Sequence, residues 1–210
     1  MEKITLYYFI VGDKVTRARG ENVKLLLEDA GLDNEYVRLS RDENWSAKKA
    51  QLIEEGFLSP TLPYIEVGGK KFGKTVPIMQ YISVKLGNKY HGSNAEEDQY
   101  LAYVAEITNE WFECLKNAFI GNDEKKENHK NIVTPRYINL FEKSYAKHDG
   151  PYILGEKITY PDFLVYHLLD DDLALHRLDG SPNLQKFVGA FEQRPNIKKY
   201  LATLPDYSSK

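Results

Sequence analysis

Residues 58–87 read LSPTLPYIEVGGKKFGKTVPIMQYISVKLG, and much of the architecture of the chain can be worked out from them. Two short strand-like runs, 64–67 and 70–72, flank Gly68-Gly69. A Gly-Gly pair between two strands predicts a tight hairpin, because both turn positions need a positive φ. Thr75 then has the place of a helix N-cap ahead of an apolar run. The stretch therefore predicts a β-hairpin followed directly by a helix.

The two ends of this hairpin also predict a binding site. Pro63 cannot donate to a strand ladder, so it belongs at the start of its strand, and the Leu62-Pro63 bond there can be cis. A cis bond would leave the backbone of Leu62 facing outward, where an extended peptide can pair. The helix that starts at Thr75 offers N–H groups and a hydroxyl to a carboxylate. We expect a site for a small anionic peptide here, with an ordinary hairpin and a capped helix as the alternative.

The composition narrows the class of protein. The chain has 210 residues, 42% hydrophobic and 28% charged, with a net charge of −3, which is typical of a soluble globular protein. No basic run indicates nucleic acid or an anionic membrane, and neither a signal peptide pattern nor an apolar run of membrane length is seen. Cys114 is the only cysteine, which fits a reducing, cytoplasmic location. The five histidines have no ligand spacing, so we assign no metal.

The first half of the chain alternates strands and helices. Residues 3–9 and 35–39 are predicted strands, and residues 17–30 and 44–55 are predicted helices. With the hairpin and its helix, the order is β-α-β-α-β-β-α, which is a thioredoxin-like α/β layout with a parallel crossover and an antiparallel edge.

The second half carries only helical patterns. We expect a linker at 88–95, so that a domain of residues 1–87 precedes an all-α C-terminal helical bundle of residues 96–210. The charged run 121–130 is expected to be a turn between helices. The predicted helices are 95–120, 131–147, 160–177, 183–193 and 196–204.

Two motifs in the second half are specific enough to indicate a family. Thr159 and Asp162 have the spacing of a capping box at the start of a buried helix. Near the end, Phe191 is followed by Arg194-Pro195 and Ile197. Both patterns, together with the proline-headed strand and the helix that opens on a hydroxyl residue, resemble the cytosolic glutathione S-transferases, over nearly the whole chain.

This resemblance implies how the thiol of glutathione is activated. A free thiol titrates near ~8.5, and lowering its pKa by about 2 units takes roughly 2.7 kcal/mol. One hydrogen bond to the thiolate supplies about 1.5–3 kcal/mol. The family places a tyrosine, serine or cysteine at the end of the first strand for this purpose. The match is Tyr8 of the tyrosine type, nearest to sigma-like enzymes, with Tyr7 as the other candidate and core packing as the alternative for both.

The resemblance also assigns the remaining site residues. Arg19, with Arg17 as the other candidate, would lie near the thiol, although residues 10–16 lengthen the preceding loop by about five residues relative to the family. Lys74 stands where the family has glutamine and Thr75 where it has serine. The implied glutathione contacts are Tyr8, Trp45, Lys49, Leu62, Pro63, Lys74, Thr75 and Glu106, and the electrophile pocket would draw on Trp111, Phe112 and Lys116. The alternatives are a surface pair for Trp45 and Lys49, a solvated helix charge for Glu106, and core packing for Trp111 and Phe112.

The expected function is therefore conjugation of glutathione, as co-substrate, to small hydrophobic electrophiles in detoxification, by a cytoplasmic homodimer that binds neither nucleic acid nor membrane. Two alternatives stay open: a glutathione-dependent isomerase or peroxidase, and a non-enzymatic structural or regulatory member of the same fold. The sequence does not encode which electrophile is used, because that pocket is built of apolar residues.

Overall fold

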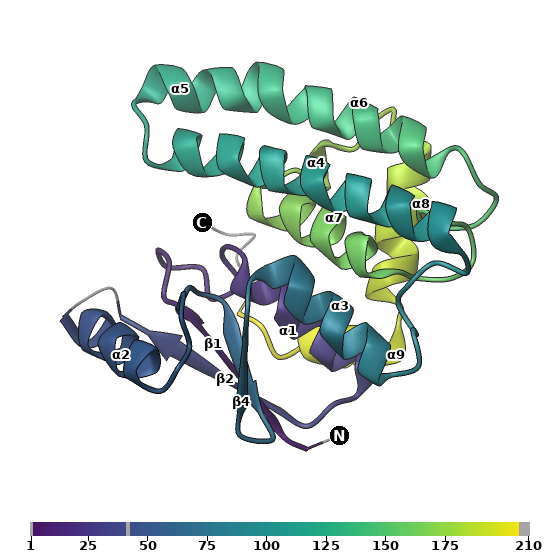
Figure 1. Cartoon of the computed structure of the whole chain (residues 1–210). Coiled ribbons are helices and arrows are strands. Elements are labelled where there is room, and N and C mark those ends of the chain that lie inside the picture. The colour runs from purple at the N-terminus through teal and green to yellow at the C-terminus, as the bar shows by residue number, and fades with distance from the viewer. Residues whose placement is uncertain (1, 41–42, 206–210) are drawn as a thin grey trace. The chain divides into compact units, whose positions relative to one another are not determined.

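The structure is a computed structural model of the chain (Figure 1). It describes residues 2–40 and 43–205, except for the side chains of Glu43 and Asn44. The contacts divide these residues into two compact units. Unit 1 takes those in Met1–Ile82 and Arg194–Lys210, and unit 2 takes Ser83–Gln193.

Unit 1 is built on a four-stranded mixed sheet in the order β2-β1-β3-β4. Parallel pairing joins β1 to β2, and antiparallel pairing joins β1 to β3 and β3 to β4. The thioredoxin-like order β-α-β-α-β-β-α is confirmed. Its elements are β1 (Ile4–Phe9), α1 (Gly20–Ala30), β2 (Asn34–Leu39), α2 (Glu43–Glu54), β3 (Tyr64–Val67), β4 (Lys70–Gly73) and α3 (Thr75–Lys85).

The alternation of side chains along β1 separates the two faces of the sheet. Ile4, Leu6 and Tyr8 are buried on the face that α1 covers, and Tyr8 packs against Gly20 at the start of that helix. Phe9 points to the other face, where its ring meets the edge of Trp45 on α2 at 5.5 Å between centroids. Successive residues of a strand point to opposite sides, so Tyr7 shares the face of α2.

The predicted Gly-Gly hairpin is confirmed. Gly68 and Gly69 turn between β3 and β4 with φ of 55° and 70°, a left-handed conformation that costs other residues free energy. The predicted helix at 17–30 is shorter than expected, because α1 begins at Gly20. Ala18, with φ of 67°, interrupts the helical conformation just before it.

A last helix, α9 (Pro195–Leu201), packs on α1 inside unit 1. The Arg194 guanidinium holds the carboxylate of Asp29 at 2.8 Å, and the Tyr200 hydroxyl donates to Glu21 at 2.6 Å. Asp29 and Glu21 both belong to α1 and are almost fully buried. The contacts thus place the chain after Gln193 with the first unit, which differs from the predicted domain of residues 96–210.

Unit 2 is helical throughout its regular structure. Its long helix α4 (Ala95–Phe119) begins where the sequence predicts, and α7 (Tyr160–Asp171) packs along it. The expected turn at 121–130 is wrong, because six of its residues form α5 (Asp123–Asn128), capped by the side chain of Asn122. The remaining elements are η1 (His129–Val133, a π-helix), α6 (Thr134–Tyr145), α7 (Tyr160–Asp171), η2 (Leu175–Arg177, a 3₁₀-helix) and α8 (Pro182–Glu192).

The π-helix η1 has a visible cause in the core of unit 2. Its wider turn puts His129 and Thr134 on one face, and both reach the carboxylate of Asp172, at 3.0 and 2.8 Å. The indole N–H of Trp111 donates to the same carboxylate at 2.8 Å. A buried carboxylate needs such donors to offset its lost hydration.

The capping box of α7 is also confirmed. Thr159 is the N-cap, and its backbone N–H donates to Asp162 at 2.7 Å. No helix in the described part of the chain is long and apolar enough to cross a membrane.

Candidate functional site

Tyr8 and the start of α1 form the centre of the candidate site. The Tyr8 hydroxyl oxygen accepts a hydrogen bond from the backbone N–H of Arg19 at 3.3 Å, and its side chain is almost fully buried. Arg19, the predicted neighbour of Tyr8, is therefore present, and it contacts the Tyr8 hydroxyl through its backbone N–H. A backbone N–H that points at a phenol oxygen strengthens the phenol as a donor to a further acceptor.

Tyr7 lies on the opposite face and is differently engaged. Its hydroxyl donates to Glu66 at 3.2 Å, and its ring stacks on Tyr64 at 4.4 Å between centroids. Burial, followed by the charge of Glu66, raises the pKa of Tyr7 to about 12. The Tyr7 hydroxyl therefore already has an acceptor on the face away from α1.

Ala18 shapes the backbone that presents Arg19. Its φ of 67° is left-handed, and its carbonyl accepts from the N–H of Glu21 at 3.2 Å. An L-residue in this conformation costs about 1–2 kcal/mol. Lys14 and Thr16, in the long preceding loop, are almost fully buried.

The strain at Ala18 gives a stability prediction. We expect Ala18→Gly to raise the free energy of unfolding by about 0.5–1 kcal/mol, because glycine adopts positive φ without the steric cost but loses more chain entropy. Urea denaturation measures the change. Ala102→Gly, at an exposed position inside α4, is the matched control and should destabilise by about 1 kcal/mol. A loss of stability in Ala18→Gly would contradict the strain argument.

The start of β3 lies next to Tyr8 in the sheet. Tyr7 pairs with Tyr64, so the next residues outward, Tyr8 and Pro63, face one another across the two strands. The Leu62-Pro63 bond is cis. Among the described residues, no hydrogen bond to the Leu62 backbone is found. The backbone N–H of Lys74 donates to the Pro63 carbonyl at 3.2 Å, so Lys74 also lies beside the start of β3.

The start of α3 departs from the sequence prediction by one residue. Thr75 is the first helical residue, and Lys74, with φ of 72°, has the N-cap place, since its carbonyl accepts the first helical bond from Ile78 at 3.0 Å. The Thr75 side chain is buried, and its hydroxyl has no partner in the described part of the chain. An unpaired buried hydroxyl beside free helix N–H groups suits an anion.

Two further predicted residues lie on α2. Trp45 is half-buried against Phe9, and Lys49, four residues on, is exposed. A spacing of four puts both side chains on the same side of the helix. Through Phe9, Trp45 lies at the same end of the sheet as Tyr8 and Pro63.

The structure therefore gathers most of the predicted site at one end of the sheet in unit 1. These residues come from β1, the α1 start, α2, the β3 start and the α3 start: Tyr8, Arg19, Trp45, Lys49, Leu62, Pro63, Lys74 and Thr75.

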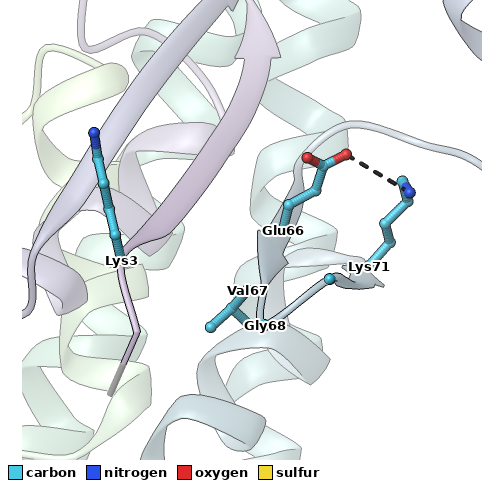
Figure 2. A pocket seen from close by; sticks show the side chains of 6 residues that line it. Lys3, Glu66, Val67, Gly68 and Lys71 are labelled. Carbon is cyan, nitrogen blue, oxygen red and sulfur yellow. Dashed lines mark ion pairs between the residues drawn. The ribbon is translucent and has the colours of Figure 1, made fainter.

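A hollow of about 220 Å³ lies at the other end of the sheet, beside the β3–β4 turn (Figure 2). Lys3, Glu66 and Lys71 carry its charges, and these are paired with one another or with neighbours. Lys71 contacts Glu55 at 2.8 Å and Glu66 at 3.9 Å, and Lys3 contacts Glu35 at 3.0 Å. This hollow does not include any of the predicted site residues.

The predicted site residues of unit 2 differ in how far they are buried. Trp111 is fully buried, stacked on Tyr137 and Phe141 and bonded to Asp172, so its expected place in an electrophile pocket is corrected to the core. Phe112 is half-buried, and Glu106 and Lys116 are exposed, with Lys116 paired to Glu113. Across the described residues, no three His, Cys, Asp or Glu side chains are grouped as metal ligands would be.

The comparisons with known proteins agree with this geometry. The family described as "Glutathione S-transferase, C-terminal domain" matches residues 109–203. The class-mu 26 kDa glutathione S-transferase isozyme 1 of Fasciola hepatica is 31% identical, over 88% of this chain and 82% of its own. Glutathione S-transferase P 10 of Caenorhabditis elegans is 29% identical, over 93% of this chain and 89% of its own.

A solved structure gives the same result. The glutathione S-transferase from Ascaris lumbricoides superposes with a TM-score of 0.76 at 26% identity, covering 97% of this chain and 98% of that one. The fold is thus that of a two-part transferase with a thioredoxin-like sheet and a helical part. The chain belongs to the glutathione S-transferase family.

Proposed function

We propose that the chain is a transferase that joins the thiol of glutathione to small hydrophobic electrophiles, with Tyr8 as the residue that activates the thiol. The observation that carries the assignment is the Tyr8 hydroxyl at the start of α1, where it accepts the Arg19 N–H at 3.3 Å. Accepting this bond does not use the proton of the phenol, which Tyr8 would donate to the sulfur atom. No observation favours the isomerase, peroxidase or non-enzymatic alternatives.

The chemistry requires the thiolate, because the thiol itself is a poor nucleophile. The Tyr8 hydroxyl donates to the sulfur and stabilises its negative charge, which lowers the pKa of the bound thiol. The thiolate then forms a C–S bond with the electrophile, the leaving group departs with its electron pair, and the thiol proton goes to solvent. Holding both reactants at one end of the sheet supplies the proximity.

The rest of the site is proposed to hold the tripeptide. The Leu62 backbone pairs with the cysteinyl residue, and the Thr75 hydroxyl with the first N–H groups of α3 receives the γ-glutamyl carboxylate. The unpaired state of the buried Thr75 hydroxyl supports this role. Lys74 adds a positive charge beside the same carboxylate, and Trp45 and Lys49 receive the glycyl end.

We infer a tyrosine-type enzyme nearest to the sigma-like class, working in the cytoplasm as a homodimer. Glu106 would contact the glutathione amine across that dimer, and Phe112 and Lys116 would contribute to the electrophile pocket.

The direct test is the pKa of glutathione bound to the whole protein, followed through the ultraviolet absorbance of the thiolate. We expect this pKa to lie about 2 units below the ordinary ~8.5 of a free thiol. A chlorinated nitroaromatic then serves as the electrophile, with release of chloride as the readout of conjugation. Binding of glutathione with an unshifted thiol pKa and no chloride release would contradict the proposed function.

A further inference from the structure

Gly20, the first residue of α1, is held between two tyrosine side chains. A Cβ atom placed on Gly20 would lie 2.1 Å from the Tyr36 hydroxyl oxygen and 2.7 Å from Cβ and Cγ of Tyr8. Both distances are far inside van der Waals contact, so only glycine leaves room for the two rings. The Tyr36 hydroxyl therefore touches the same backbone position as Tyr8.

The sheet brings the two tyrosines to one face. In the parallel ladder of β1 and β2, Leu6 pairs with Tyr36 and Tyr8 pairs with Arg38. Leu6 and Tyr8 are buried on the face that α1 covers, so Tyr36 and Arg38 of β2 lie on that face too. The Tyr36 hydroxyl therefore lies between the sheet and the first residue of α1.

The Tyr36 hydroxyl acts there through its size, because it has no hydrogen-bond partner among the described residues although its oxygen is buried. Burial, followed by the charge of Glu21, raises the pKa of Tyr36 well above its usual range, so the hydroxyl stays protonated and neutral. A buried, unpaired hydroxyl is unfavourable for stability. The contact with Gly20 is therefore the role that the geometry gives the Tyr36 hydroxyl.

A second set of contacts keeps the Tyr36 ring in place. The Arg38 guanidinium lies over the ring at 3.9 Å from its centroid and pairs with Glu21 at 3.6 Å. Glu21 follows Gly20 directly and also accepts the Tyr200 hydroxyl of α9 at 2.6 Å. Arg38 therefore holds the Tyr36 ring in place, and Glu21 holds the start of α1 in place.

We propose that Tyr36 is a positioning residue that holds the Arg19–Gly20 backbone against Tyr8 and so sets the strength of the Arg19 N–H bond to the Tyr8 oxygen. The proposal rests on the proposed role of Tyr8 as the thiol donor. Arg19 directly precedes Gly20, and its bond to Tyr8 is already long at 3.3 Å. Without the Tyr36 oxygen, the helix start can settle toward β2 and away from Tyr8.

The test is Tyr36→Phe, which removes only the hydroxyl. We expect the pKa of bound glutathione to rise by about 0.5 unit, the share expected when one neutral hydrogen bond is weakened and not lost. The kcat/KM should fall about 1.5-fold at neutral pH and about threefold well below the thiol pKa. The KM for glutathione should stay near that of the wild type, and the thermal midpoint should not fall, because the hydroxyl has no partner to lose and its burial is unfavourable. A purely structural role would lower the midpoint and leave the thiol pKa unchanged.

Tyr64→Phe is the matched control, since the Tyr64 hydroxyl is also buried and unpaired among the described residues but belongs to the other face of the sheet. It should leave the thiol pKa unchanged. If Tyr36→Phe does not fold, Arg38→Lys takes its place, because lysine keeps the charge beside Glu21 but loses the planar group over the Tyr36 ring. The thiol pKa should again rise.

Tyr8→Phe, measured beside these variants, separates the two hypotheses. If Tyr8→Phe raises the thiol pKa and Tyr36→Phe (or Arg38→Lys in its place) does not, the positioning role is overturned and the proposed function stands. If Tyr8→Phe also leaves the thiol pKa unchanged, Tyr8 is not the donor, and the role of Tyr36 is overturned with it.

Discussion

Tyr8→Phe is expected to raise the pKa of bound glutathione by about 1–2 units, because a hydrogen bond to a charged group is worth about 1.5–3 kcal/mol. At neutral pH the thiolate fraction, and with it kcat/KM, should fall about 3–25-fold, and well below the thiol pKa about 10–100-fold. The loss should shrink as the pH is raised, since at high pH the thiol ionises without help. The KM for glutathione should change little, because Leu62 and Thr75 are proposed to hold the tripeptide.

Tyr7→Phe is the matched control for this prediction. Tyr7 directly precedes Tyr8 but donates to Glu66 on the opposite face of the sheet. The control should cost about 1 kcal/mol of stability through that lost bond and leave the thiol pKa unchanged. A rise of the thiol pKa in Tyr7→Phe, with none in Tyr8→Phe, would move the catalytic assignment to Tyr7.

The candidate site could be predicted from sequence where it depends on local chain chemistry. Pro63 at a strand start, the Gly68-Gly69 turn and the hydroxyl of Thr75 each have a local physical reason to be where they are. The register of the sheet then brings Pro63 to Tyr8, because β3 runs antiparallel to β1 and Pro63 lies next to the Tyr7–Tyr64 pair. No pattern in the sequence gives that register directly.

Tyr36 and Gly20 are the functional candidates that the sequence reading missed. Sixteen positions separate them along the chain, and neither belongs to a motif. Gly20 stands in the first turn of a helix, where glycine is a poor helix former. That local cost was the available signal, because a glycine inside a helix lowers stability relative to alanine and so points to a packing reason at that position.

The fold was predictable as a class and less so in its connections. Periodicity gave the strands and the long helix α4, but it assigned the chain after Gln193 to the helical part. Arg194 and Tyr200 instead bind Asp29 and Glu21 of α1, and long-range side-chain contacts of this kind leave no periodic signal. In the same way, the polar run at 121–130 hides α5, which is capped by Asn122 and fully solvated.

The largest stability effect is expected at Asp162, the third helical residue of α7 and the carboxylate of its capping box. Its carboxylate accepts four hydrogen bonds: Oδ1 from Tyr145 at 2.9 Å and the Ile153 N–H at 3.0 Å, and Oδ2 from the Thr159 N–H and hydroxyl, both at 2.7 Å. Asp162→Asn replaces one oxygen by an NH₂ group that faces donors. We expect a loss of about 3 kcal/mol or more in unfolding free energy. The exposed Asp179→Asn is the control and should change stability by less than about 0.5 kcal/mol.

The pH dependence gives this prediction a sign. Burial raises the pKa of Asp162 from 3.8 to about 6, although its hydrogen bonds from Thr159, Ile153 and Tyr145 act in the other direction. The folded state therefore binds the proton more tightly than the unfolded state between these values, so the contribution of Asp162 to stability falls as the pH rises from about 4 to about 6. Asparagine does not titrate, so the stability gap between wild type and variant should narrow over that range by up to about 3 kcal/mol. Chemical denaturation at a series of pH values measures it, and a gap that widens with rising pH would show that the four hydrogen bonds outweigh burial at this carboxylate.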